Sequence, residues 1–190
     1  MIGTGGGVQE ATRTRVKCAW GKFRELAPIL TKRGVSLNIK GKIFKICVQR
    51  VLVYASETWA LNVEDKQRLV QCENAMVRWL FGVCLKNRCS MAELRERLGI
   101  QDVLEVAWIG RLRWFGHLQR KEESDWVTRC RFLEVEGKIG RGRSAKNLHE
   151  VVSNGMRILG VNSGMAQDRA SWRSVIRGNR LTRVDMDNRR

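Results

Sequence analysis

Apolar residues recur at helical spacing along most of this chain of 190 residues, and only one proline interrupts the pattern. Residues three and four positions apart lie on one face of a helix, so such stripes predict amphipathic helices. Proline breaks helix interiors, and a chain with Pro28 alone can form long uninterrupted helices. No segment shows convincing strand alternation. We therefore expect an all-α fold of about seven to eight helices.

The expected helix starts share a short polar side chain that can accept a hydrogen bond from an N–H group of the first turn. They are Ser36, Asn62, Ser90, Asp102, Ser124 and Ser163. Glu93 follows Ser90 by three positions and completes the pattern of a capping box. Gly82 and Gly99 are expected to end helices, and the segment 28–34 is expected to end the first one.

The chain divides by composition into a helical bundle and a smaller basic helical region. The expected regions are a Gly-rich terminus 1–8, a helical region 9–136, a basic Gly/Arg loop 137–146, a C-terminal helical pair 147–178 and an Arg-rich mobile tail 179–190. A softer boundary is expected near 82–90. We find no internal repeat.

The formal net charge is +17, from 36 Lys and Arg against 19 Asp and Glu. Such a charge attracts polyanions, with nucleic acid as the first expected partner and an anionic membrane surface as the second. No apolar run approaches the roughly 20 residues that a membrane-spanning helix needs. The N-terminal residues lack the apolar segment of a secretory signal. We expect an intracellular protein of the nucleus or cytoplasm, without a membrane or a small-molecule substrate as partner.

The six cysteines are scattered, which is typical of reduced thiols in an intracellular protein. Cys84 and Cys89 come nearest to a zinc-binding pair, but their spacing does not match one. His117 is expected to cap a helix or lie at the edge of the core, and it could also contact phosphate. Ser56 has no histidine partner or elbow glycines, so we expect no serine nucleophile. We expect no metal and no cofactor.

Cationic residues concentrate in two places. The first fifty residues carry eleven Lys or Arg and only two acidic residues, Glu10 and Glu25. A helical pair with one cationic face could lie along a phosphate backbone, or it could be a solvated surface. The segment 137–144 could bind phosphate through its glycine backbone and arginines, or it could be a basic linker. The expected nucleic-acid contacts are Lys17, Arg24, Lys40, Lys42, Arg111, Arg113, Arg141 and Arg143.

Seven short motifs follow one another in a specific order. They are 53–61 (VYASETWAL), 77–83 (VRWLFGV), 94–100 (LRERLGI), 111–118 (RLRWFGHL), 133–137 (LEVEG), 141–143 (RGR) and 168–173 (DRASWR). Together they resemble the C-terminal part of reverse transcriptases encoded by non-LTR (LINE-type) retrotransposons. The resemblance covers nearly the whole chain, from about Gly5 onward.

The resemblance implies a truncated RNA-directed DNA polymerase that begins just after the palm. A helical thumb and a basic C-terminal region would follow, and the thumb would hold an RNA–DNA hybrid, RNA or DNA through its phosphate backbone. This chain departs from the family pattern at Ala55, Ser144 and Leu148, where the family has Gly, Pro and Trp.

The carboxylates that two-metal polymerase chemistry requires are the main departure from a complete enzyme. The only Asp-x-Asp sequence, Asp185 to Asp187, lies in the Arg-rich tail, with no strand to present it. We therefore expect that the chain by itself is not an enzyme. Two alternatives stay open: a host-adopted helical module that binds proteins through tryptophans, and a translated pseudogene without function.

Overall fold

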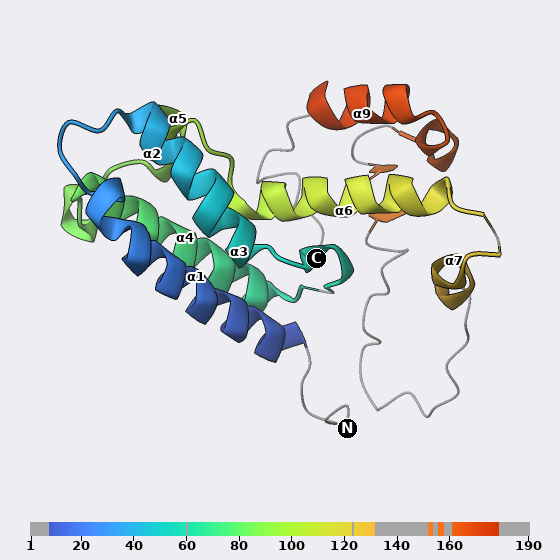
Figure 1. Cartoon of the computed structure of the whole chain (residues 1–190), viewed down its shortest axis with the longest axis horizontal. Coiled ribbons are helices and arrows are strands. Elements are labelled where there is room, and N and C mark those ends of the chain that lie inside the picture. Colours follow the sequence, from blue (N-terminus) through green and yellow to red (C-terminus); the bar gives the residue numbers. More distant parts are fainter. Residues whose placement is uncertain are drawn as a thin grey trace. The chain divides into compact units, whose positions relative to one another are not determined.

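The computed structural model is helical, and it contains no strand within the residues that it describes (Figure 1). Those residues are 8–59, 61–122, 124–131, 152–153, 156–157 and 161–178. The expected all-α fold is confirmed. The chain forms two compact units, the first made of Met1–Ser56 and Leu61–Ala107 and the second of Glu57–Ala60 and Trp108–Arg190. The expected regions 1–8, 137–146 and 179–190 lie wholly or mostly outside the described residues.

The first unit is built from two long helices that pack on each other and the short helices that cover them. Its elements are α1 (Val8–Leu30), α2 (Leu37–Ile43), the π-helical turn η1 (Phe44–Gln49), α3 (Arg50–Leu52), α4 (Val63–Phe81), η3 (Leu85–Asn87) and α5 (Met91–Leu98). Helix α1 packs on α4, η1 and α3, and α2 packs on α5 (Figure 1). The core contains Phe23, Phe44, Leu52, Leu69 and Met76, all fully buried.

Most helix ends of the first unit follow the local sequence rules. Ser36 and Asn62 accept hydrogen bonds from the N–H groups of Ile39 and Asp65, as expected for N-caps. Gly82 and Gly99 end their helices at φ values of 66° and 64°, a conformation that favours glycine.

One expectation about a helix end was wrong, and another was confirmed. Ser90 occupies the N-cap position of α5, but its side chain makes no capping hydrogen bond, so the capping box is not formed. Helix α1 ends at Leu30, within the expected segment 28–34, and Pro28 lies inside its last turn. A proline removes one backbone donor, and here the helix extends only two residues beyond it.

A close backbone approach joins α2 to α5. A Cβ atom added at Gly41 would lie 1.8 Å from the carbonyl oxygen of Leu98. Since no larger side chain fits against that backbone, Gly41 is what allows the two helices to touch.

A buried polar network also stabilises the first unit. The Glu73 carboxylate, fully buried on α4, accepts hydrogen bonds from Gln49, Arg95 and the N–H of Val103. Arg95 also pairs with Asp102 at 3.1 Å. Burial raises the pKa of Glu73 to about 7, while the positive charge of Arg95 acts in the opposite direction.

The second unit contains most of α6 and the helices after it. Helix α6 (Val103–Gln119) passes from the first unit into the second between Ala107 and Trp108. The other elements are α7 (Trp126–Arg131), η4 (Ser163–Ala166) and α9 (Arg169–Gly178). The short turn η2 (Ser56–Thr58) spans the division between the units, because Ser56 belongs to the first unit and Glu57 and Thr58 belong to the second. Leu112, Phe115, Trp172 and Ile176 belong to its apolar core.

Aspartate and asparagine residues begin these later elements, where serines were expected. Asp125, not Ser124, accepts the N–H of Val127 at the start of α7. Ser163 begins only a short turn capped by Asn162, whereas α9 begins after Asp168.

Candidate nucleic-acid interface

Three of the expected contacts lie on the surface of the first unit. Lys17 and Arg24 are exposed on α1, and Lys42 is exposed on α2. The guanidinium of Arg24 lies 5.8 Å from the ring centroid of Trp20, which restricts the arginine without removing its charge. Lys40 is only 7% exposed, so its expected role as a phosphate contact is wrong. It precedes Gly41, where α2 approaches α5, and packing covers most of its surface.

Arg111 is the second expected contact that the structure contradicts. It is 6% exposed, and its Nη2 donates to the carbonyl oxygen of Trp59 at 2.6 Å. Its Nε donates to the carbonyl oxygen of Glu57 at 3.3 Å, and burial lowers the pKa of its guanidinium. Because these contacts use the guanidinium to hold the segment 57–59 against α6, Arg111 has a structural role.

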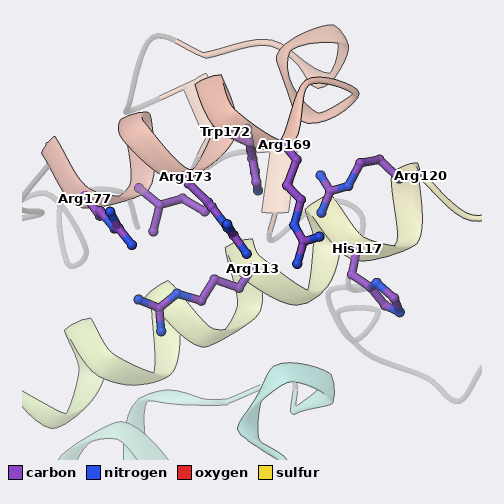
Figure 2. A pocket seen from close by; sticks show the side chains of 8 residues that line it. Arg113, His117, Arg120, Arg169, Trp172, Arg173 and Arg177 are labelled. Atoms are coloured by element: carbon purple, nitrogen blue, oxygen red, sulfur yellow. The ribbon is translucent and has the colours of Figure 1, made fainter.

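Arg113, two positions further on, points to a different surface. It lines a groove between α6 and α9 that encloses about 610 Å³ (Figure 2). The described lining residues are Arg113 and His117 from α6, Arg120 directly after that helix, and Arg169, Trp172, Arg173, Ile176 and Arg177 from α9. Figure 2 shows Arg169 and Arg173 extending from α9 toward α6. The groove is therefore a site where five arginines from two segments converge.

Helical periodicity places the α9 arginines in one row. Arg169, Arg173 and Arg177 are separated by four positions each, so they occupy successive turns of the same side of the helix. Trp172 and Ile176 are buried on the neighbouring side and belong to the core below the groove. The same helix thus packs through its apolar side and presents its cationic side to solvent.

The groove exists because α9 packs directly on the backbone of α6. The indole Nε1 of Trp172 donates to the carbonyl oxygen of Leu112 at 3.0 Å. A Cβ atom at Gly116 would lie 2.2 Å from that same nitrogen. Two further bonds fix the end of the groove: Arg120 donates to the carbonyl oxygen of Ala166, and Gln167 donates to that of Gln119.

The charge of the groove is not balanced by its described surroundings. No carboxylate belongs to the described lining, and none of the salt bridges found among the described residues involves a groove arginine. Asp168 caps the start of α9, where bonds from Ser171 and Ala170 lower its pKa. Asp125 pairs with Lys121 at 2.6 Å, and this bond lowers the pKa of Asp125. Both carboxylates therefore already have local partners.

The expected contacts Arg141 and Arg143 lie outside the described residues. Of the groove arginines, the sequence reasoning selected only Arg113 and missed Arg120, Arg169, Arg173 and Arg177. The four-residue spacing of the α9 arginines was a usable signal of a cationic helix side. Whether that side lines a groove depends on which helix covers the apolar side of α9.

Other candidate chemistry is not assembled in the part of the chain that the structure describes. Ser56 is buried, and Cys84 and Cys89 are exposed on either side of the turn η3. No group of three or more His, Cys, Asp or Glu residues could hold a metal ion among the described residues. Within the same residues, no helix is both long and apolar enough to cross a membrane.

Comparison with known proteins gives one informative similarity. The chain is 24% identical over 180 residues to an uncharacterised transposon-derived protein of Caenorhabditis elegans, in an alignment that covers 87% of this chain. The aligned part is 63% of that protein's length. No family model matches the chain, and no solved structure matches it. The similarity supports an origin in a transposable element.

Proposed function

We propose that this chain is the thumb and post-thumb part of a non-LTR retrotransposon reverse transcriptase, and that it binds nucleic acid through the phosphate backbone. The ordered motifs and the transposon-derived relative support the origin. The all-α fold agrees with a helical thumb region. By itself the chain is not an enzyme in this proposal, because the palm carboxylates are not part of its sequence.

The observation that carries the binding proposal is the α6–α9 groove. Arginine forms paired hydrogen bonds with phosphate oxygens, and a converging set of arginines suits a polyanion better than a small neutral ligand. Lys17, Arg24 and Lys42 on the first unit would add charge at longer range. Contacts of this kind carry little sequence information, so we propose binding with little sequence preference.

A matched pair of double variants tests this proposal. Arg113→Gln with Arg173→Gln removes two groove charges, whereas Arg129→Gln with Arg157→Gln removes two exposed charges that are not in the described lining. Fluorescence anisotropy with labelled RNA and DNA of mixed sequence measures the affinity. We expect micromolar binding by wild type, about a tenfold loss in the groove variant and a smaller loss in the control. Equal losses would show that only net charge matters.

A protein-interaction module is a second candidate, and the exposed tryptophans favour it. Trp79 and Trp126 are 50% and 71% exposed. Large exposed aromatic side chains are common at protein interfaces. If Trp79→Ala and Trp126→Ala abolish a host-protein interaction while polynucleotide affinity is absent in wild type, this second function replaces the first.

A further inference from the structure

Three aromatic rings of the first unit gather where α1 packs on α4. Trp20 and Phe23 come from α1, and Trp79 comes from α4. The ring centroids lie 5.7 Å apart for Trp20 and Phe23, 6.0 Å for Trp20 and Trp79, and 5.6 Å for Phe23 and Trp79. Tilted and edge-on contacts of this kind are favourable, so each ring helps to hold the other two. We call these three residues the aromatic patch.

The aromatic patch runs from the core of the unit to its surface. Phe23 is fully buried, Trp20 is partly exposed, and Trp79 is 50% exposed. The ring of Trp79 is therefore held by its two neighbours without being covered by them. A side chain that is already held loses less conformational freedom when a ligand binds, which makes Trp79 a preorganised contact surface.

Exposed cations flank the aromatic patch on α1. Lys17 and Arg24 lie three positions before and four positions after Trp20, so helical periodicity puts all three on one side of the helix. The guanidinium of Arg24 lies 5.8 Å from the ring centroid of Trp20. Neither cation takes part in a salt bridge found among the described residues, whereas the two carboxylates of α1, Glu10 and Glu25, pair with other cations of that helix.

An exposed ring beside unneutralised cations suits a nucleotide, which carries an aromatic base and a phosphate. A base can stack on an aromatic side chain while cations bind the phosphates next to it. A base inside a duplex is covered on both faces by its neighbours, so only an unpaired base can stack in this way. An acidic protein segment would satisfy the cations but would make no use of the ring of Trp79.

We infer that the aromatic patch stacks unpaired bases of a single strand of nucleic acid, while Lys17 and Arg24 bind neighbouring phosphates. This site is on the first unit and contacts bases, whereas the α6–α9 groove is on the second unit and contacts phosphates. The inference rests on the proposed function only in requiring that the chain binds nucleic acid. Every base has a face that can stack, so the site adds affinity with little sequence preference.

An abasic strand separates stacking from phosphate binding, because it has the phosphates of an ordinary strand and no bases. The ligands are a labelled 12-nucleotide oligothymidylate and an abasic strand of the same length, which is within the range of about 4–16 nucleotides typical of single-strand sites. Fluorescence anisotropy measures the affinity of the full chain for each. Wild type should bind the oligothymidylate at least about fivefold more tightly, because stacking of one base contributes that much or more.

Trp79→Leu removes the exposed ring and keeps an apolar side chain in the aromatic patch. Trp126→Leu is the matched control, since Trp126 is 71% exposed and lies on α7 in the second unit. Trp79→Leu should bind the two strands equally, whereas Trp79→Phe and the control should keep most of the preference for oligothymidylate. Circular dichroism checks that the variants fold.

A second comparison does not depend on replacing a ring. Lys17→Gln with Arg24→Gln removes the two exposed cations beside the aromatic patch, and Lys32→Gln with Arg33→Gln removes two exposed cations after the end of α1. The two variants have the same net charge. The first should bind oligothymidylate about tenfold more weakly than wild type, and the second should lose clearly less.

The outcomes separate this inference from the proposed function. Equal binding of both strands by wild type, a preference that survives in Trp79→Leu, or equal losses in the two charge variants would overturn the inference and leave the proposed function standing. Arg113→Gln with Arg173→Gln should weaken binding of both strands alike and keep the preference. If polyglutamate binds as tightly as oligothymidylate and is lost equally in Trp79→Leu, the patch binds an acidic protein segment instead. If wild type binds neither strand at low salt, the proposed function fails as well.

Discussion

Replacing Gly116 with alanine should loosen the packing of α9 on α6 and so damage the groove. The added Cβ would lie 2.2 Å from Nε1 of Trp172 and 2.5 Å from its Cδ1, both far inside normal contact. The indole ring is rigid and 2% exposed, so it cannot swing aside into free space. Either the ring or the whole of α9 must move.

The expected cost follows from three effects. Overpacking a core site costs about 1–3 kcal/mol. Losing the bond from Trp172 to the Leu112 carbonyl costs about another 1 kcal/mol, while alanine gains about 0.5–1 kcal/mol over glycine inside a helix. The net effect is a destabilisation of about 1–3.5 kcal/mol in the second unit.

Gly21→Ala is the matched control, because a Cβ at that position in α1 meets no atom within 4 Å. Urea unfolding followed by tryptophan fluorescence and by far-UV circular dichroism measures both variants. Gly21→Ala should be as stable as wild type or slightly more so, whereas Gly116→Ala should unfold at lower urea and bind single strands more weakly. If Gly116→Ala is as stable as its control, the direct packing of Trp172 on the α6 backbone is wrong.

Two further predictions concern buried charges. Burial raises the pKa of Glu73 from 4.5 to about 7, so the folded state favours the protonated form. The stability that this group contributes is therefore fully present below about pH 4.5 and is lost as the pH rises toward 7. Glu73→Gln should therefore flatten the pH dependence of unfolding across this range, by up to about 3 kcal/mol, and an unchanged profile would contradict the raised pKa. Arg111→Met should cost about 2–4 kcal/mol because it leaves the carbonyl oxygens that the guanidinium binds, including that of Trp59, without these bonds. Arg113→Met should leave stability nearly unchanged and weaken polynucleotide binding, so comparable destabilisation by both changes would contradict the assigned roles.

Local features of the fold were predictable because their causes are local. A cap such as Asn62 or a terminal glycine such as Gly99 acts within one helical turn, and the sequence shows the whole interaction. Ser90 shows the limit of this reasoning, since the right residue type stands at the right position without forming the bond. Ser124 and Asp125 are both residue types that cap helices, so the sequence alone did not show that Asp125 accepts the N–H group of Val127.

The binding groove was less predictable because it depends on contacts between distant segments. Arg111 and Arg113 look equivalent in the sequence, yet one is buried against Glu57 and Trp59 and the other lines the groove. Helical phase separates them, but only the position of the partner segment says which side is inside. Likewise, the row on α9 becomes half of a site only because Trp172 reaches Leu112, 60 positions earlier in the chain.

The salt dependence of polynucleotide affinity tests the central claim most directly. Equilibrium binding of the wild-type chain to a labelled single strand would be measured from low to physiological salt. The logarithm of the association constant should fall linearly with the logarithm of salt concentration, by about 0.7 for each phosphate neutralised, and so by about 3 or more for a groove that engages four or five phosphates. Binding that does not change with salt, or no binding at the lowest salt, would contradict the claim that this chain binds nucleic acid through its phosphate backbone.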